Sequence, residues 1–251
     1  MSRRSRKNSK SRKTHKREDF TRHHVAPVMQ DPIPIWNKAP LRALNAKQQE
    51  YINLVNTKKI ICSTGVAGSG KTYIAAMMAA DMLIDPNSEI DGIILARPNE
   101  MEGTTTIGLL PGTVEEKLSP WLAPLVQTLK ERLGAGHFEA YVASGKIEML
   151  PLEMIKGRSL NKKFLICDEA EDITFPVLKT LLLRIGEDCK VIIDGDVRQT
   201  SISANSGLQT LLNLDADHYL PISFIDFDSW DYCVRSEECK LLGRIFESAG
   251  V

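Results

Sequence analysis

The sequence has little cysteine and no long hydrophobic run. Its five cysteines are spread over 251 residues without a Cys-X-X-Cys pair or a cluster of cysteine and histidine. This argues against a disulfide framework and against a structural zinc site. The longest apolar stretch, 73–84, is interrupted by Asp81 and falls short of the roughly 20 residues that a membrane-spanning helix needs. We therefore expect a protein of a reducing, cytoplasmic compartment with no membrane partner.

The chain also has no net charge, but its charges are unevenly distributed. Residues 1–24 contain ten lysines and arginines and two acidic residues, so this segment carries +8 and the remainder carries −8. A segment rich in serine, arginine and lysine, with Phe20 as its one aromatic residue, has almost nothing to bury and is predicted to be a disordered basic arm. Such an arm either binds polyanions by releasing counterions or serves as a solubilising or targeting extension.

Proline is concentrated in the next segment, 25–44, where four residues hold the backbone extended. This composition predicts a linker that leads into one domain spanning 45–251. Asn45 is the expected N-cap of the first helix of that domain. The expected buried stripe of this helix consists of Tyr51, Ile52, Leu54 and Val55.

Beyond residue 58, short apolar runs alternate with helical stretches. Most of these runs lack polar alternation, which is typical of strands covered on both faces of a parallel sheet. We therefore predict an α/β fold with a doubly wound, mostly parallel sheet, in which residues 98–160 form an insertion. The expected strands are 60–64, 93–96, 147–150, 164–167, 191–194 and 220–224, and the expected helices are 70–84, 114–133, 175–184, 206–214 and 232–248.

One segment between a strand-like and a helical run matches the pattern GxxxxGK[ST]. Glycines allow backbone N–H groups to converge on phosphate oxygens, and the N-terminus of the following helix adds a favourable dipole. The lysine is expected to reach the β- and γ-phosphates, and the threonine to ligate Mg²⁺. The alternative is an ordinary glycine-rich turn. The predicted phosphate loop consists of Gly65, Val66, Ala67, Gly68, Ser69, Gly70, Lys71 and Thr72.

Two further elements follow apolar strand candidates. Asp168 and Glu169 come directly after 164–167; we expect Asp168 to hold Mg²⁺ and Glu169 to orient and deprotonate an attacking water. Gln199 lies just past the strand candidate 191–194, where an α/β sheet presents its ligand crevice, and its amide is expected to sense the γ-phosphate. Acidic pairs and Gly-Asp turns also occur on ordinary surfaces. The prediction therefore rests on the order in which the phosphate loop, the acidic pair and Gln199 follow one another along the chain.

With these motifs the chain resembles the PhoH family, single-domain ATPases related to the first core domain of superfamily 1 helicases. The Arg-Pro pair and the Leu-Pro-Gly element distinguish this family from other NTPases more sharply than the phosphate loop does. The matching residues are Gln48, Tyr51, 65–72, Arg97-Pro98, 108–112, Glu116-Lys117, 157–160, 168–170, 183–186, Gly195-Asp196, Gln199 and 206–208.

The resemblance implies a RecA-like sheet in which the strand before Gln199 lies between the phosphate-loop strand and the strand before Asp168. It also implies that Gln48 reads the adenine edge, which makes ATP the nucleotide. The alternative for Gln48 is a solvated position on a helix face. The compact chain with its basic arm looks like the phage-encoded type, which would place it in the host cytoplasm.

Two positions depart from the family pattern. A glutamine of the family is replaced by Glu171, which would repel the γ-phosphate if it faces that group and would matter little if it faces a partner surface. The family's Asp-Val-Val-Arg element appears loosened as the segment 231–235, ending in Arg235.

The chain leaves no room for a second RecA-like domain after the sensor loop, so we expect a neighbouring subunit to supply an arginine to the site. This predicts a homo-oligomer, such as a hexameric ring. Arg184 is the first candidate for this finger and Arg235 the second, with Arg158 and Arg97 also considered; each is otherwise expected in a structural ion pair.

These interpretations lead to two functions. The first is Mg²⁺-dependent ATP hydrolysis coupled to binding of RNA or single-stranded DNA, or to translocation along it. The second is a nucleotide-dependent switch or assembly factor without helicase activity. Stimulation of hydrolysis by single-stranded nucleic acid distinguishes the first from the second.

Overall fold

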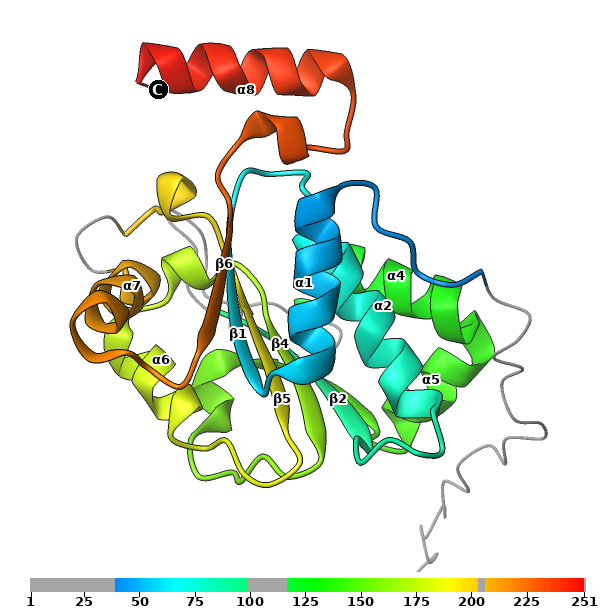
Figure 1. Ribbon diagram of the computed structural model, residues 1–251. Coiled ribbons are helices and arrows are strands. Elements are labelled where there is room, and N and C mark those ends of the chain that lie inside the picture. Colours follow the sequence, from blue (N-terminus) through cyan, green and yellow to red (C-terminus); the bar gives the residue numbers. More distant parts are fainter. Residues whose placement is uncertain (1–38, 99–116, 203–205, 251) are drawn as a thin grey trace, which may run out of the picture.

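The computed structural model describes residues 39–98, 117–202 and 206–250. The predicted arm, most of the linker and the Leu-Pro-Gly element at 108–112 lie outside the described residues. The domain is built on a six-stranded sheet in which every described strand pair is parallel (Figure 1). This confirms the predicted α/β fold with a parallel sheet.

The strand order is β3-β2-β4-β5-β1-β6. β5 therefore lies between β1 and β4, as the family resemblance implied. The last strand was predicted three residues too early, because Pro221 has no N–H to donate and the ladder with β1 begins at Ser223. The strands are β1 (Ile60–Gly65), β2 (Gly92–Arg97), β3 (Ile147–Pro151), β4 (Lys163–Cys167), β5 (Lys190–Asp194) and β6 (Ser223–Phe227).

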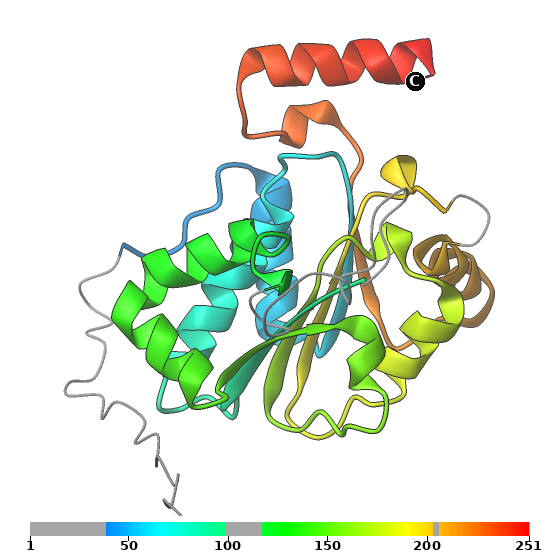
Figure 2. The ribbon, with the colours of Figure 1, turned by 180° about the vertical axis from the view of Figure 1, so that it is seen from behind.

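Helices cover both faces of the sheet (Figures 1 and 2). On one face pack α1 (Ala46–Thr57), α2 (Lys71–Ile84), α4 (Ala123–Leu133) and α5 (Ala135–Ala143). On the other pack α6 (Phe175–Leu182), α7 (Gly207–His218) and the short helix η3 (Leu152–Ile155). Alternate residues of each strand enter the two cores, which explains why the strands lack polar alternation. None of the helices in the described part is both long and apolar enough to cross a membrane.

Local signals account for several helix boundaries. The side chain of Asn45 accepts a hydrogen bond from the Gln48 N–H at 2.9 Å and caps α1, as predicted. Of the predicted helix 114–133, residues 114–116 lie outside the described part, 117–118 are helical, and a turn at 119–122 separates them from α4, which begins at Ala123, next to Pro124. The prediction missed α5, which lies between Gly134 and Gly145. Within 98–160, β3 pairs with β2 and so forms an edge of the central sheet.

The C-terminal region rises from β6 beyond the carboxyl ends of the strands (Figures 1 and 2). One helix was predicted at 232–248. The chain instead forms the short helix η7 (Trp230–Tyr232), an extended link, and α8 (Glu237–Ala249). The side chain of Ser236 accepts from the Cys239 N–H and caps α8, which explains its later start.

Candidate functional site

A cavity of about 400 Å³ lies at the carboxyl edge of the sheet. The loop between β1 and α2 forms its floor, and the residues that follow β2, β4 and β5 form its walls. In a parallel α/β sheet this edge is where ligands bind. Most of the predicted site residues therefore meet in one place, including Lys71, Thr72, Asp168, Glu169 and Gln199.

The phosphate loop needs glycine at its two ends. Gly65 has φ +114°, and a Cβ there would lie 2.3 Å from the carbonyl oxygen of Phe227 on the neighbouring strand. Gly70 has φ +89°, and a Cβ there would lie 2.8 Å from Nε2 of Gln48. Both positions combine a positive φ with close packing. Only glycine, which has no Cβ, fits at either position without strain.

Lys71 is the first residue of α2, and its side chain folds back over the loop. Its Nζ donates to the carbonyl oxygens of Gly65 at 2.8 Å and Val66 at 3.1 Å, and to Oγ of Ser69 at 3.3 Å. The lysine is buried. An ammonium group at the N-terminus of a helix, where the first N–H groups have no partner within the helix, is suited to bind phosphate oxygens.

Thr72 lies between two buried carboxylates. Its Oγ1 is 3.3 Å from Oδ1 of Asp168 and 3.1 Å from Oδ2 of Asp194. Burial and the negative charge of neighbouring carboxylates raise the pKa of Asp168 to about 6 and that of Asp194 to about 7, although Arg97 and Lys71 respectively oppose these shifts. Two close carboxylates with raised pKa values are stabilised by a cation.

This cluster fits a magnesium ion bound together with a nucleotide. Oδ1 of Asp194 is buried without a hydrogen-bond partner in the described structure, and hydroxyl and carboxylate oxygens are the ligand types that Mg²⁺ prefers. The described residues contain no group of three or more His, Cys, Asp or Glu side chains able to hold a metal by themselves. Thr72 and Asp168 would therefore hold the ion with phosphate oxygens, as is usual for Mg²⁺ in such sites.

Glu169 occupies a left-handed backbone position, with φ 55° and ψ 47°. This conformation is uncommon for a residue other than glycine. The carboxylate is partly exposed, and its Oε1 lies 3.4 Å from Nη2 of Arg97. Arg97 is itself anchored by donation to the carbonyl oxygen of Trp121 at 2.8 Å. A solvent-accessible carboxylate at this position is suited to act on a water molecule.

Glu171 is one of the residues that line the cavity. Its side chain is buried against the turn after β5, where Oε2 accepts from the Asp196 N–H at 3.1 Å. Burial, followed by a hydrogen bond to Glu169, raises the pKa of Glu171 to about 9. In its protonated form the carboxyl group presents a donor and an acceptor, as a glutamine does. A raised pKa weakens the charge repulsion expected from this residue.

The turn after β5 is held by Asp196. Its carboxylate accepts from Nε2 of Gln199 at 2.9 Å and from the N–H and Nε of Arg198. Gln199 lines the cavity from the short helix η5 (Val197–Gln199). The position agrees with a role near a terminal phosphate, and that role stays a prediction.

Gln48 supports the loop from behind. It is buried, its Nε2 donates to the carbonyl oxygen of Ser69 at 2.8 Å, and its Oε1 accepts from the Leu44 N–H at 2.8 Å. The solvated alternative for Gln48 is therefore wrong. Contact with adenine stays a prediction, for which Nε2 retains a second N–H and Oε1 a second lone pair.

The arginines considered as fingers lie in different parts of the structure. Arg235 lies over its own phosphate loop, since a Cβ on Gly68 would be 2.8 Å from its Cδ, and the neighbouring Val234 N–H donates to the Gly68 carbonyl oxygen at 2.9 Å. Arg184 is exposed on the far side, after α6, where its carbonyl oxygen accepts from the Leu160 N–H. Arg158 pairs with Glu148 at 2.6 Å. Arg235 is therefore available within the chain, whereas Arg184 is available only to another molecule.

Asp194 is the residue to which sequence reasoning gave no role. A signal was present: it ends a fully apolar strand whose neighbour carries the phosphate loop. The hydrogen bond to Thr72 depends on the strand order, which periodicity alone does not provide.

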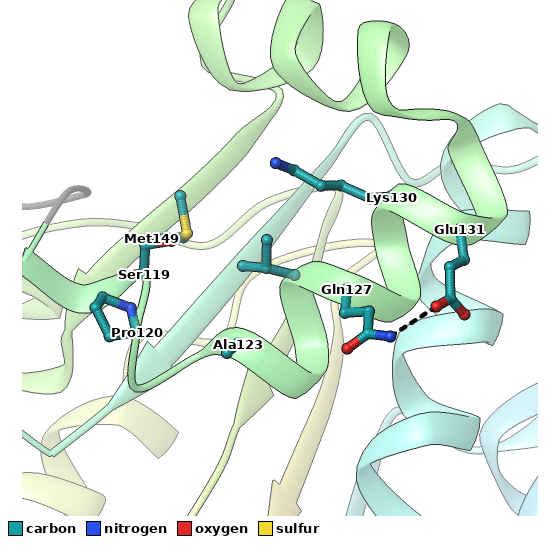
Figure 3. A pocket seen from close by; sticks show the side chains of 8 residues that line it. Ser119, Pro120, Ala123, Gln127, Lys130, Glu131 and Met149 are labelled. Carbon is teal, nitrogen blue, oxygen red and sulfur yellow. Dashed lines mark hydrogen bonds between the residues drawn. The ribbon is translucent and has the colours of Figure 1, made fainter.

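A second, larger cavity of about 810 Å³ lies between α4 and β3 (Figure 3). Its polar side chains include Lys130, Gln127 and Glu131, and Nε2 of Gln127 donates to Oε1 of Glu131 at 2.8 Å. The remaining described lining is mostly apolar, with Met149 and Val126. This arrangement has none of the convergent charges that distinguish the cavity at the phosphate loop.

The parallel sheet, the phosphate loop and the acidic residues after β4 define a RecA-like P-loop NTPase. The chain belongs to the PhoH family: the family model described as "PhoH-like protein" matches residues 40–247. This confirms the resemblance seen in the sequence.

Relatives agree with this family assignment, and a solved structure agrees with the fold. The chain is 34% identical to Protein PhoH of Escherichia coli K12 over 206 residues, covering 80% of this chain and 57% of that protein. It is 36% identical to a PhoH-like protein of Bacillus subtilis over 197 residues, covering 76% and 59%. The large terminase of a thermophilic bacteriophage matches with a TM-score of 0.51 at 13% identity, covering 81% of this chain and 50% of that one. The chain thus spans under two thirds of these relatives.

Proposed function

We propose that this protein binds ATP with Mg²⁺ and hydrolyses it. The observation that carries this proposal is the convergence in one cavity of Lys71 and Thr72, at the start of α2, with Asp168 and Glu169, which follow β4. The ammonium group of Lys71 binds and neutralises phosphate oxygens. Bound Mg²⁺ supplies further charge neutralisation. Glu169 accepts the proton of the attacking water, with Arg97 holding its carboxylate in place.

Glu169→Gln provides the direct test of this assignment. The amide keeps the shape of the side chain but cannot accept the proton, so we expect ATP binding to persist while turnover falls by roughly 10²-fold or more. Binding is measured with a fluorescent ATP analogue and turnover by phosphate release. Glu153→Gln, an exposed site outside the cavity, is the matched control. Undiminished turnover in Glu169→Gln would contradict the role of Glu169.

Coupling to RNA or single-stranded DNA is the finer part of the proposal. Its support is the net charge of +8 within residues 1–24, because flexible lysine and arginine side chains contact phosphates without sequence choice. We expect single-stranded RNA or DNA to stimulate hydrolysis, and deletion of residues 1–24 to reduce the salt dependence of binding. A hydrolysis rate unchanged by either nucleic acid would favour the switch or assembly factor.

Assembly into a homo-oligomer is the third part. Arg184 has no access to its own cavity, so it serves as a finger only in a head-to-tail arrangement. Specific activity that rises with protein concentration is the expected result. Full activity at dilutions where only monomers remain would contradict a shared site.

A further inference from the structure

The C-terminal helix α8 contacts the rest of the described chain through one stripe of residues. Gly243 packs so closely on the indole of Trp230 that a Cβ would lie 2.4 Å from Cε2. Arg244 forms an ion pair with Asp231, and Glu247 accepts from Nε1 of Trp230 at 3.0 Å. Glu247 lies four positions after Gly243 and three after Arg244, so the three residues share one face of the helix. That face is directed at η7.

The opposite stripe of α8 is apolar and exposed. Leu241, Leu242, Ile245 and Phe246 retain between 48% and 58% of their surface. Figures 1 and 2 show α8 standing beyond the edge of the sheet, away from the helices that cover its faces. A helix of 13 residues is marginal in water without tertiary packing, so this face is suited to bury itself against a partner.

A second exposed apolar surface lies at the opposite end of the sheet, in the same chain. A cavity of about 300 Å³, here called the α6–α7 groove, opens between α6, α7, the first residue of β1 and the segment that precedes β6. Leucines and isoleucines dominate its lining, including Leu183, which is 73% exposed. Lys179 is the one charged residue among its described lining residues.

The charges at the two surfaces are complementary. Lys179, in the lining of the groove, and Arg184, which directly follows Leu183 of that lining, are exposed and form no ion pair with a described residue. On α8, Glu238 lies three and four positions before Leu241 and Leu242 and therefore shares their face. Glu238 is exposed, and among the described residues it also forms no ion pair. In a docked arrangement, the acidic Glu238 at the start of the apolar stripe would therefore face the basic residues at the groove.

We propose that the apolar face of α8 docks into the α6–α7 groove of a second copy of this chain. The groove lies at the amino end of the sheet, beside Ile60 and Leu220, whereas α8 lies beyond the carboxyl end. The two surfaces are too far apart to meet within one chain. Because they are different surfaces, the contact is head-to-tail and leads to a ring or a filament.

This docking deepens the proposed assembly, on which it rests, by naming both of its surfaces. Arg184 directly follows Leu183 at the rim of the groove. α8 follows Arg235, which lies over the phosphate loop. Docking therefore brings Arg184 of one copy to the end of the neighbour that holds the nucleotide cavity.

The test is the oligomeric state of the full chain, measured without nucleotide by analytical ultracentrifugation. Leu242→Glu alters the helix face, Leu183→Glu alters the groove, and Leu44→Glu is the control at another leucine that is 73% exposed. Loss of a central apolar contact is expected to raise the dissociation constant at least about tenfold for the first two variants and to leave the control unchanged. Circular dichroism and binding of an ATP analogue, which stay unaltered, separate this result from misfolding and from failure of the nucleotide site.

Mixing the two variants makes the test specific for head-to-tail contact. Each variant alone is expected to be monomeric, whereas the mixture forms one intact interface per pair and yields a 1:1 heterodimer. Glu238→Lys is expected to weaken assembly and Lys179→Glu to restore it in the double variant. The proposal is overturned if the parent chain is monomeric at high concentration, if Leu183→Glu has no effect while Leu242→Glu does, since α8 would then pair with itself, or if the mixture stays monomeric.

Discussion

The phosphate loop and α8 lie at the same end of the sheet but are held in place in different ways. The loop is fixed by buried polar contacts from its own chain, including the Nζ of Lys71 on the Gly65 carbonyl oxygen and the Nε2 of Gln48 on that of Ser69. α8 is fixed by Trp230 and a few ion pairs, and it directs its apolar side chains to the outside.

This difference indicates whether each region is stabilised by its own chain or by another molecule. A loop with satisfied hydrogen bonds keeps its shape in a single molecule, so changes there should act at any protein concentration. An exposed apolar helix face depends on another molecule, so changes there should act through assembly. Val234 connects the two, because its N–H donates to the Gly68 carbonyl oxygen at the start of the link to α8.

The largest expected effect is at the loop. Lys71→Ala removes the cation that neutralises the phosphates, and we expect hydrolysis to fall by roughly 10²-fold or more at every protein concentration. Phosphate release over a range of concentrations measures this. Lys130→Ala, at the cavity between α4 and β3, is the control and should retain activity. A loss that appeared only in dilute samples would break the distinction between loop and helix.

The next effect separates the two arginines. Arg235→Ala removes a charge from the same chain, so we expect hydrolysis to fall roughly tenfold or more. Mixing Arg235→Ala with Glu169→Gln should restore nothing, because both defects lie in the same site. Mixing Arg184→Ala with Glu169→Gln should restore part of the activity, since the defects lie on different sides of an interface. Equal behaviour of the two mixtures would contradict the assignment of Arg235 to its own site.

Much of the cavity at the phosphate loop could be predicted from the sequence. The phosphate loop and the acidic residues after β4 are contiguous motifs bounded by apolar strands, so local patterns predicted both. The burial of Cys62 and Cys167 was also a consequence of their place in apolar runs. The strand order came from the family resemblance, and with it the position of Gln199.

The parts that could not be predicted depend on contacts between distant residues. The charge state of Glu171 follows from its burial against the turn at Gly195, which is 24 positions away. The position of Arg235 follows from the path of the chain after β6. The exposed face of α8 requires knowing that η7, and not the sheet, is its neighbour, and periodicity alone does not distinguish a core-facing stripe from an unpartnered one.

Glu171→Gln should change the pH dependence with a smaller effect on the rate. Because burial raises its pKa to about 9, the folded chain holds a proton that the unfolded chain loses near pH 4.5. Between these values the free energy of unfolding contributed by Glu171 declines as the pH rises. The glutamine amide does not titrate, so the variant does not lose this free energy of unfolding. We expect it to be more stable than the parent at pH 8 by roughly 1–3 kcal/mol.

Activity should report the same proton. The parent chain is expected to lose hydrolysis as the pH approaches 9, because ionised Glu171 repels Glu169, whereas Glu171→Gln keeps its rate there. Urea unfolding at pH 6 and pH 8, with the pH profile of hydrolysis, measures both. Glu148→Gln, half-buried and outside the cavity, is the control. Identical pH profiles for the parent and Glu171→Gln would show that Glu171 is already ionised.

The smallest expected effect comes from one methyl group on α8. Alanine has a higher helix propensity than glycine by about 1 kcal/mol, so Gly136→Ala in α5, where a Cβ would meet nothing within 4 Å, should stabilise the protein slightly. Gly243→Ala adds the same methyl group 2.4 Å from the Trp230 ring and should instead lower the melting temperature by a few degrees and displace α8 from η7. Hydrolysis by the monomer should change little, because the loop is held by its own contacts. If Gly243→Ala raised the melting temperature as Gly136→Ala does, the packing of α8 on Trp230 would be too loose to define which face of the helix points outward.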